Sequence, residues 1–210
     1  MPMTIDDRGH RNVCEIEGGE VEGTPTLTIL GDDNRISIGR DVNLYESRIE
    51  ILGNHNHATF GDACKLRIVS QFVTDRGVIS IGTKTTMIDV LMQLHETRTI
   101  RIGEDCAFSG GVWISVSDMH SILDRDTDER INYGQDIVVG DHCWLGARVM
   151  LLKGAIVGNG SVVGAGSVVT GTVPEYCVSA GVPARVVREN TRWERDLIPD
   201  APLERSGTGG

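Results

Sequence analysis

Apolar residues recur at every sixth position through the second half of the chain, and a glycine follows four of them. The apolar positions are Val139, Leu145, Leu151, Val157, Val163 and Val169. A helix repeats every three to four residues and a strand every two, so a period of six with a turn residue predicts a short strand, a corner and another short strand. Three such hexads make one triangular coil of about 18 residues, the unit of a solenoid.

The repeat continues upstream in a looser form. Apolar-glycine pairs begin at Ile38, Phe60, Ile81 and Ile102, with gaps of 22, 21 and 21 residues. Each gap predicts one coil that carries a few extra residues at a corner, so the repeat region covers residues 26–188. A small residue lies four places after three of the apolar positions, at Cys64, Cys106 and Cys143. We expect these thiols to pack inside the coils, because a buried free cysteine behaves as a small hydrophobic residue.

The pattern breaks once, after Ile114. The spacing predicts the next apolar position at residue 120, but the repeat resumes only at Val139, so 19 residues are inserted. The segment 117–136 contains eight charged residues and cannot form a wall of a prism. We expect it to project as a loop, and projecting loops on rigid scaffolds commonly carry function.

The ends of the chain do not follow the repeat. Residues 1–25 match no coil clearly and stay unassigned. Residues 189–200 are expected to form a short helix that caps the last coil, because Trp193 and Leu197 are four apart. The last ten residues, 201–210, are expected to be disordered.

Composition and charge exclude several classes of protein. The 210 residues fit one domain, and a net charge of -10 argues against a duplex nucleic acid partner. The sequence has no apolar stretch of about 18 residues and no signal-peptide core at its N-terminus, so we expect a cytoplasmic protein without a membrane span. Five cysteines without a CxxC pair favour neither a disulfide framework nor a zinc site, and no metal is expected.

His120 opens the inserted segment and is the strongest candidate for chemistry. An imidazole can accept a proton near neutral pH, as a general base must. The alternative is that a lone histidine near carboxylates is only a solvated surface group. Asp118, two residues earlier, either orients His120 or is an ordinary loop residue.

Three segments carry a family resemblance: SDMHSI, CWLGARVMLLKGAIVGNGSVVGAGSVV and SAGVPARVV. Together they resemble the maltose, galactoside and polysaccharide O-acetyltransferases of the hexapeptide-repeat acyltransferase family. The resemblance covers roughly residues 100 to 188 strongly. It implies a left-handed parallel β-helix, all-β in class, in which His120 deprotonates the acceptor hydroxyl.

The same resemblance implies a coenzyme A site. Trp144 would pack near the pantetheine arm, and the backbone at Ala147 and Ala165 would line the same groove. The residues that would reach the nucleotide end are Thr170, Arg185 and Arg188. Other interpretations stay open: Trp144 can fill a subunit interface, and the arginines can be solvated charges. The family builds its active sites between the subunits of a homotrimer.

The expected function is therefore acetyl-CoA-dependent O-acetylation of a carbohydrate hydroxyl, on a bacterial capsular polysaccharide, an exopolysaccharide or its precursor. Within acetyltransferases the alternatives are N-acetylation of an amino sugar nucleotide and modification of a xenobiotic such as an antibiotic. A non-catalytic β-helical scaffold is a third possibility. A zinc hydratase of the γ-carbonic anhydrase type would need converging histidines, and the H-x4-H spacing is absent from the chain. The candidate histidines for such a site are His55, His57, His95, His120 and His142.

Overall fold

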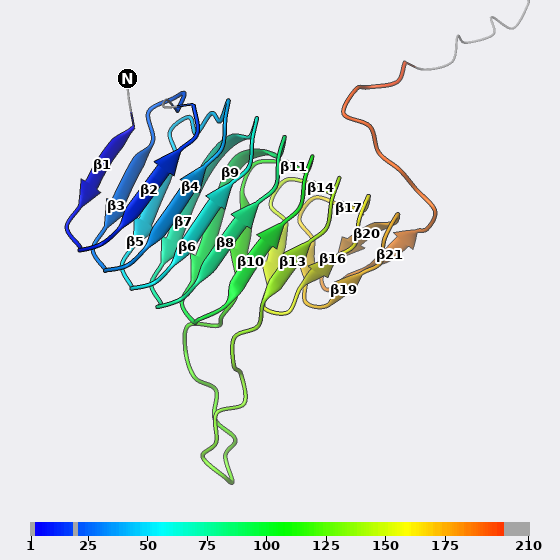
Figure 1. Ribbon diagram of the computed structural model, residues 1–210. Helices are drawn as coiled ribbons and strands as arrows, with labels where there is room; N and C mark the ends of the chain where they lie inside the picture. Colours follow the sequence, from blue (N-terminus) through cyan, green and yellow to red (C-terminus); the bar gives the residue numbers. More distant parts are fainter. Residues whose placement is uncertain (1–2, 19–20, 200–210) are drawn as a thin grey trace, which may run out of the picture.

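The computed structural model describes residues 3–18 and 21–199, and every regular element in this part of the chain is a β-strand. The strands wind into a solenoid with three walls, which the chain visits in a fixed order in each coil (Figure 1). Strands in neighbouring coils pair in parallel, and the single antiparallel strand pair among the described residues is at the C-terminal end. The predicted parallel β-helix is confirmed, and its form is consistent with the left-handed family fold.

The first wall consists of β1 (Thr4–Asp7), β3 (Thr26–Ile29), β5 (Arg48–Ile51), the second halves of β7 (Lys65–Phe72) and β9 (Thr86–Leu94), then β12 (Val112–Ser115), β15 (Met150–Leu152) and β18 (Val168–Val169). The second wall consists of β2 (Val13–Ile16), β4 (Arg35–Ile38), β6 (His57–Phe60), β8 (Val78–Ile81), β10 (Thr99–Ile102), β13 (Ile137–Val139), β16 (Ile156–Val157) and β19 (Thr172–Val173). The third wall begins with the first halves of β7 and β9 and continues with β11 (Ala107–Phe108), β14 (Trp144–Leu145), β17 (Val162–Val163) and β20 (Val178–Gly181). The last strand, β21 (Ala184–Arg188), turns back along β20.

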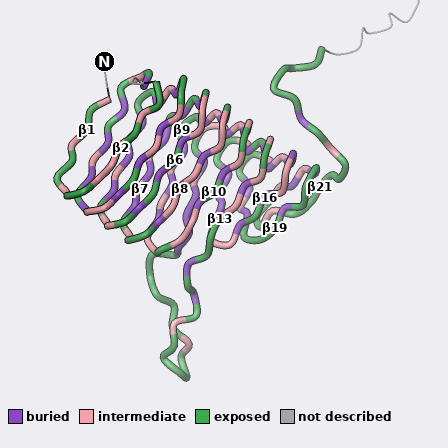
Figure 2. The backbone as a smooth tube through the Cα atoms, in the orientation of Figure 1, coloured by how far each residue is buried: buried purple, intermediate pink, exposed green. Residues whose placement is uncertain are grey.

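The core fills the inside of the prism, because most strands between the two ends bury every second residue (Figure 2). In β4 and β6, Ile38 stacks on Phe60 in register, and both are 1% exposed. Removing the Phe60 ring would cost about 3–5 kcal/mol, since the rigid coils could not collapse around the cavity. Cys64, Cys106 and Cys143 are fully buried, which confirms their expected interior position.

Glycines of the repeat allow neighbouring coils to approach at the corners. A Cβ atom at Gly146 would lie 2.6 Å from the amide nitrogen of Ala165 in the next coil. No side chain fits in that space, so the hexad glycine is required by the stacking distance of the coils. The periodic glycines therefore have a structural role.

The two ends of the described chain differ from the sequence-based expectation. The unassigned N-terminal segment contains the first coil, since β1 pairs with β3 and β2 pairs with β4. The helix predicted over residues 189–200 is wrong: residues 189–199 form an irregular segment with bends, and residue 200 lies outside the described residues. The predicted disordered tail, residues 201–210, lies outside them as well.

The reason for the missing helix is tertiary. The Trp193 indole donates to the carbonyl of His142 at 2.7 Å, and the Trp193 carbonyl lies 3.1 Å from the His142 ring nitrogen Nε2. The Arg195 guanidinium binds the Asp105 carboxylate at 2.8 Å. These bonds hold the segment against the third wall and replace the hydrogen bonds of a helix. No helix in the described residues is long and apolar enough to cross a membrane.

Candidate active site

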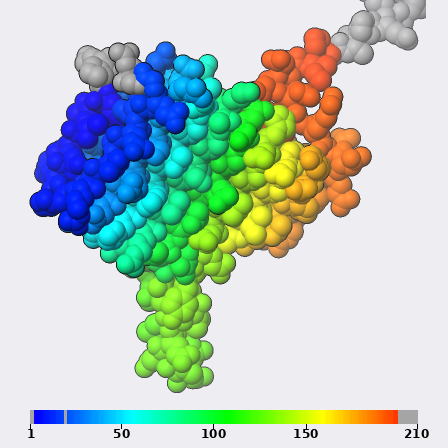
Figure 3. Space-filling model, viewed as in Figure 1, coloured from blue at the N-terminus to red at the C-terminus, as the bar shows by residue number. Residues whose placement is uncertain are grey.

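The inserted loop leaves the first wall after β12 and enters the second wall at β13, so it projects from the corner between these walls (Figures 1 and 3). His120 lies near its beginning and is exposed. The backbone amide of His120 donates to the carbonyl of Asp118 at 2.7 Å. The candidate base therefore lies at an accessible point, on a loop that must be held in place by its own contacts.

Asn132 fastens the two limbs of the loop together. Its amide nitrogen donates to the His120 carbonyl at 2.8 Å and to Asp118 Oδ2 at 2.9 Å. Its amide oxygen accepts from the Ile122 amide at 2.7 Å and from Arg130 Nε at 3.2 Å. The side chain is 6% exposed, and all four of its hydrogen-bonding positions are used. Asn132 thus fixes the backbone on which His120 is carried.

Glu96, two residues after the end of β9, anchors the loop to the solenoid. Its carboxylate accepts from Ser117 Oγ at 2.6 Å, from the Arg130 guanidinium at 2.7 Å and from the Gly134 amide at 3.2 Å. Burial raises the pKa of Glu96, but the hydrogen bonds from Arg130, Ser117 and Gly134 outweigh it and lower the pKa to about 2. The group is therefore ionised at neutral pH and holds both ends of the loop.

Asp118 does not contact the His120 ring. Its carboxylate forms an ion pair with Lys153, which follows β15, and accepts a hydrogen bond from Asn132. The hydrogen bond from Lys153 is the main reason why the pKa of Asp118 is below its usual value. The open question of the sequence is thus answered: Asp118 ties the loop to the next coil, and its side chain does not orient the imidazole.

Trp144 lies on the third wall with its side chain pointing outward and 42% exposed. It is in register with Val162, then Val178 and then Arg188 on successive strands. Three strand steps place Arg188 about 14 Å from Trp144 along the wall. Arg185, one of the other expected nucleotide contacts, pairs with Ala180 on the same wall. One exposed face therefore carries Trp144 and both arginines.

The remaining expected residues lie at corners. Ala147 and Ala165 are exposed at the corner between the third and first walls, and the Gly166 amide donates to the Ala147 carbonyl at 2.8 Å. Thr170 follows β18 and lies at the corner between the first and second walls, where the His120 loop also starts. Within one chain, His120 and Thr170 are thus separated from Trp144, because the third wall is opposite that corner.

The C-terminal segment adds residues that the sequence did not indicate. Trp193 is 9% exposed, stacks on His142 at 4.4 Å between ring centroids, and lies 6.0 Å from the Trp144 ring. A cavity of 630 Å³ lies between this segment and the third wall, lined by Ala107, Trp144 and residues 192–198. The segment therefore forms one side of the approach to Trp144. The position of this segment depends on hydrogen bonds between Trp193 and His142, which are 51 residues apart. No local sequence motif indicates it.

The described residues contain no group of three or more His, Cys, Asp and Glu side chains placed to hold a metal ion. His142, one of the histidines considered for such a site, is 2.8 Å from the Asp105 carboxylate and packs on Trp193. Its surroundings explain it as a structural residue.

Comparison with known proteins decides the family. Residues 136–171 match the model described as bacterial transferase hexapeptide (six repeats). A polysialic acid O-acetyltransferase of Neisseria meningitidis is 34% identical over 193 residues, which are 91% of this chain and 89% of that protein. The chain belongs to the hexapeptide-repeat acyltransferase family. This membership confirms the expected enzyme class, an acyltransferase.

Solved structures of this family extend the similarity to the whole solenoid. The polysialic acid O-acetyltransferase OatWY matches with a TM-score of 0.90 and 30% identity, over 97% of each chain. The polySia-specific acetyltransferase NeuO matches with a TM-score of 0.81 and 26% identity, over 95% of this chain and 92% of that one. Since these matches include the early coils and the inserted loop, the similarity extends well beyond the hexad region.

Proposed function

We propose that this family member is a polysaccharide O-acetyltransferase that transfers an acetyl group from acetyl-CoA to a hydroxyl of a sialic acid polymer on the bacterial capsule. The similarity to the polysialic acid O-acetyltransferase OatWY, over 97% of both chains, is the observation that carries this proposal. This similarity extends through the early coils and the inserted loop, from which we expect the acceptor site to be built. The activity belongs in the cytoplasm, where acetyl-CoA is available.

His120 is the proposed catalytic base. Its imidazole takes the proton of the acceptor hydroxyl while the hydroxyl oxygen attacks the thioester carbonyl carbon. The carbon–sulfur bond then breaks, the acetyl ester remains on the sugar, and the coenzyme A thiolate leaves and receives the proton. Such a base contributes about 10²–10⁴-fold to the rate. Its exposed position on a loop fixed by Asn132 and Glu96 suits a group that must meet a large acceptor.

The third wall is the proposed donor site. The pantetheine arm would lie along Trp144 and the exposed backbone at Ala147 and Ala165, with the nucleotide phosphates near Arg185 and Arg188. The strand register supports this direction, because it leads from Trp144 to Arg188 without a change of wall. Arginine is well suited to phosphate oxygens, since its planar guanidinium donates two parallel hydrogen bonds.

The separation of these groups supports a homotrimer with active sites between subunits. His120 and Thr170 lie at the corner between the first and second walls, whereas Trp144 lies on the opposite wall of the same chain. A catalytic site that uses both needs the corner of one subunit against the third wall of the next, and three subunits close such a head-to-tail ring. Light scattering at assay concentration tests this: a fully active monomer would exclude the shared site.

The activity is tested with a panel of acceptors and acetyl-CoA. The acceptors are polysialic acid, maltose, a galactoside, an amino sugar nucleotide and chloramphenicol, with free thiol release and product mass as readouts. We expect kcat/KM to be highest for polysialic acid. His120→Ala should lower kcat at least about 100-fold without changing the KM for acetyl-CoA. His57→Ala, an exposed histidine of the second wall, is the matched control and should be unchanged. A higher kcat/KM for a neutral small acceptor would refute the proposed substrate.

A further inference from the structure

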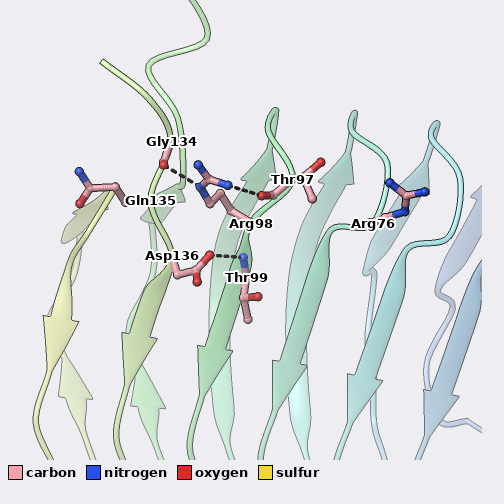
Figure 4. Close-up of a pocket in the computed structure, with 7 residues that line it drawn as sticks. All are labelled: Arg76, Thr97, Arg98, Thr99, Gly134, Gln135 and Asp136. Carbon is pink, nitrogen blue, oxygen red and sulfur yellow. Dashed lines mark hydrogen bonds between the residues drawn. The ribbon is translucent and has the colours of Figure 1, made fainter. Parts of the chain in front are cut away.

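A polar pocket of 480 Å³ lies at the base of the His120 loop, on the corner between the first and second walls (Figure 4). Its volume is typical of sites that bind small molecules. Three successive coils form the pocket. Each coil contributes residues that lie at or just before the start of its strand in the second wall. The lining residues are Arg76, Thr97, Arg98, Thr99, Gly134, Gln135 and Asp136.

Arg98 is fixed in this pocket by neutral partners. Its Nε donates to the Gly134 carbonyl at 2.6 Å and its Nη1 to the Thr97 carbonyl at 2.7 Å. It forms no ion pair with any described residue, so its positive charge is not compensated by a carboxylate. The second terminal nitrogen, Nη2, has no partner among the described residues and can donate to a ligand. A half-buried guanidinium held this way is pre-organised for an anion.

Arg76 provides a second cation in the preceding coil. It is exposed and forms no ion pair within residues 3–18 and 21–199. In Figure 4, Thr97 lies between the two guanidinium groups. The pocket lining also contains one carboxylate, that of Asp136, which accepts a hydrogen bond from the Thr99 amide at 2.8 Å. The lining thus carries two guanidinium groups against one carboxylate, although the whole chain carries -10. The neighbouring Asp75 carboxylate offsets part of the Arg76 charge, so the excess positive charge is centred on Arg98.

We propose that this pocket binds the carboxylate of a sugar residue of the acceptor polymer, next to the residue that is acetylated. The inference rests on the proposed function, in which every acceptor residue is acidic. A chain of net charge -10 repels a polyanion at long range, so binding requires a local cationic site. The Thr97 hydroxyl donates to the Asp75 carbonyl, so the Thr99 hydroxyl is the more suitable partner for a sugar hydroxyl beside Arg98.

The position of the pocket connects it to the reaction. Gly134, whose carbonyl holds Arg98, is two residues from Asn132, and Asn132 holds the backbone of His120. A sugar carboxylate between Arg76 and Arg98 would therefore hold the polymer against the loop that carries the base. The same anion chemistry would also suit a phosphate of coenzyme A, so the test must separate the two ligands.

The test uses Arg76→Gln, because Arg98 also fastens the loop and its replacement would move His120. With polysialic acid as acceptor, we expect the KM of Arg76→Gln to rise about tenfold, the loss of one charge-assisted hydrogen bond. Its kcat and its KM for acetyl-CoA should equal those of the wild type. With the carboxyl-reduced polymer, both proteins should have the same KM. Arg35→Gln removes an exposed arginine of the second wall outside the pocket and should match the wild type on every acceptor.

The possible outcomes separate the two proposals. If the wild type acetylates polysialic acid and Arg76→Gln has a KM within twofold of it, the pocket assignment is wrong and the proposed function remains. If Arg76→Gln instead raises the KM for acetyl-CoA, the pocket serves the donor and the assignment is also overturned. If the wild type does not acetylate sialic acid polymers at all, the proposed function is wrong, and the assignment of the pocket to the acceptor is wrong as well.

Discussion

Replacing Glu96 by glutamine should loosen the loop that carries His120. The substitution keeps the size of the side chain and removes the charge that the Arg130 guanidinium neutralises at 2.7 Å. Ser117 and Gly134 would keep an acceptor, but a neutral one. Arg130, a loop residue that is 25% exposed, would then lose its ion-pair partner on the solenoid. We expect the loop to open more often while the solenoid stays folded.

The magnitude follows from the pKa. The pKa of Glu96 is lowered from 4.5 to about 2, and a tenfold change in proton affinity corresponds to about 1.4 kcal/mol, so the carboxylate contributes at most about 3 kcal/mol. Since the side chain is 21% exposed, we expect about 2 kcal/mol for the loop. The pKa of Glu96 is lower in the folded protein than in the unfolded chain, so the folded state favours the ionised carboxylate. This stabilisation is complete above pH 4.5 and is lost as the pH falls from 4.5 towards 2.

Hydrogen exchange measures this effect locally. A loss of about 2 kcal/mol predicts that loop amides exchange about 30-fold faster in Glu96→Gln at pH 7. The difference from the wild type should be constant between pH 6 and 8 and shrink below pH 4.5. Glu129→Gln is the matched control, because Glu129 is an exposed carboxylate of the same loop. Exchange within threefold of the wild type in Glu96→Gln would show that the ion pair does not hold the loop.

Three further changes test other parts of the site. Asn132→Ala should lower kcat about tenfold with little change in the KM for acetyl-CoA, because it leaves buried loop groups unpaired; an unchanged kcat would contradict this role. Trp144→Ala should raise the KM for acetyl-CoA, and Arg185→Ala should raise it in a salt-dependent way; equal KM values in both would make these residues structural. Trp193→Ala should release the C-terminal segment from the third wall, so limited trypsin digestion should cleave it faster than in the wild type, and equal cleavage rates would argue against the His142 stack as its anchor.

The six-residue repeat predicted the short strands of the second half correctly, because the pattern of buried residues is encoded in neighbouring positions of the sequence. Leu145, Leu151 and Val163 are fully buried, as the six-residue period requires. The same local reasoning failed at the C-terminus, where the spacing of Trp193 and Leu197 indicated a helix. Trp193 is buried against His142, whereas Leu197 is 95% exposed, so the two do not share a buried face. Hydrogen bonds to a distant coil decided that segment.

The site divides in the same way. Sequence alone proposed His120 as the base, through the break in the period and the family motif, and Trp144 as a donor contact, through the same motif. It could not show that Glu96 and Asn132 hold the loop, or that Arg76 and Arg98 border one pocket. A period of six reports which residues point inward, but not which outward residues meet at a corner. That depends on the register of the coils, and the register is set by how many residues each corner contains. The tertiary structure alone therefore placed His120 and Trp144 on opposite sides of one chain, which is why the proposed reaction needs a second subunit.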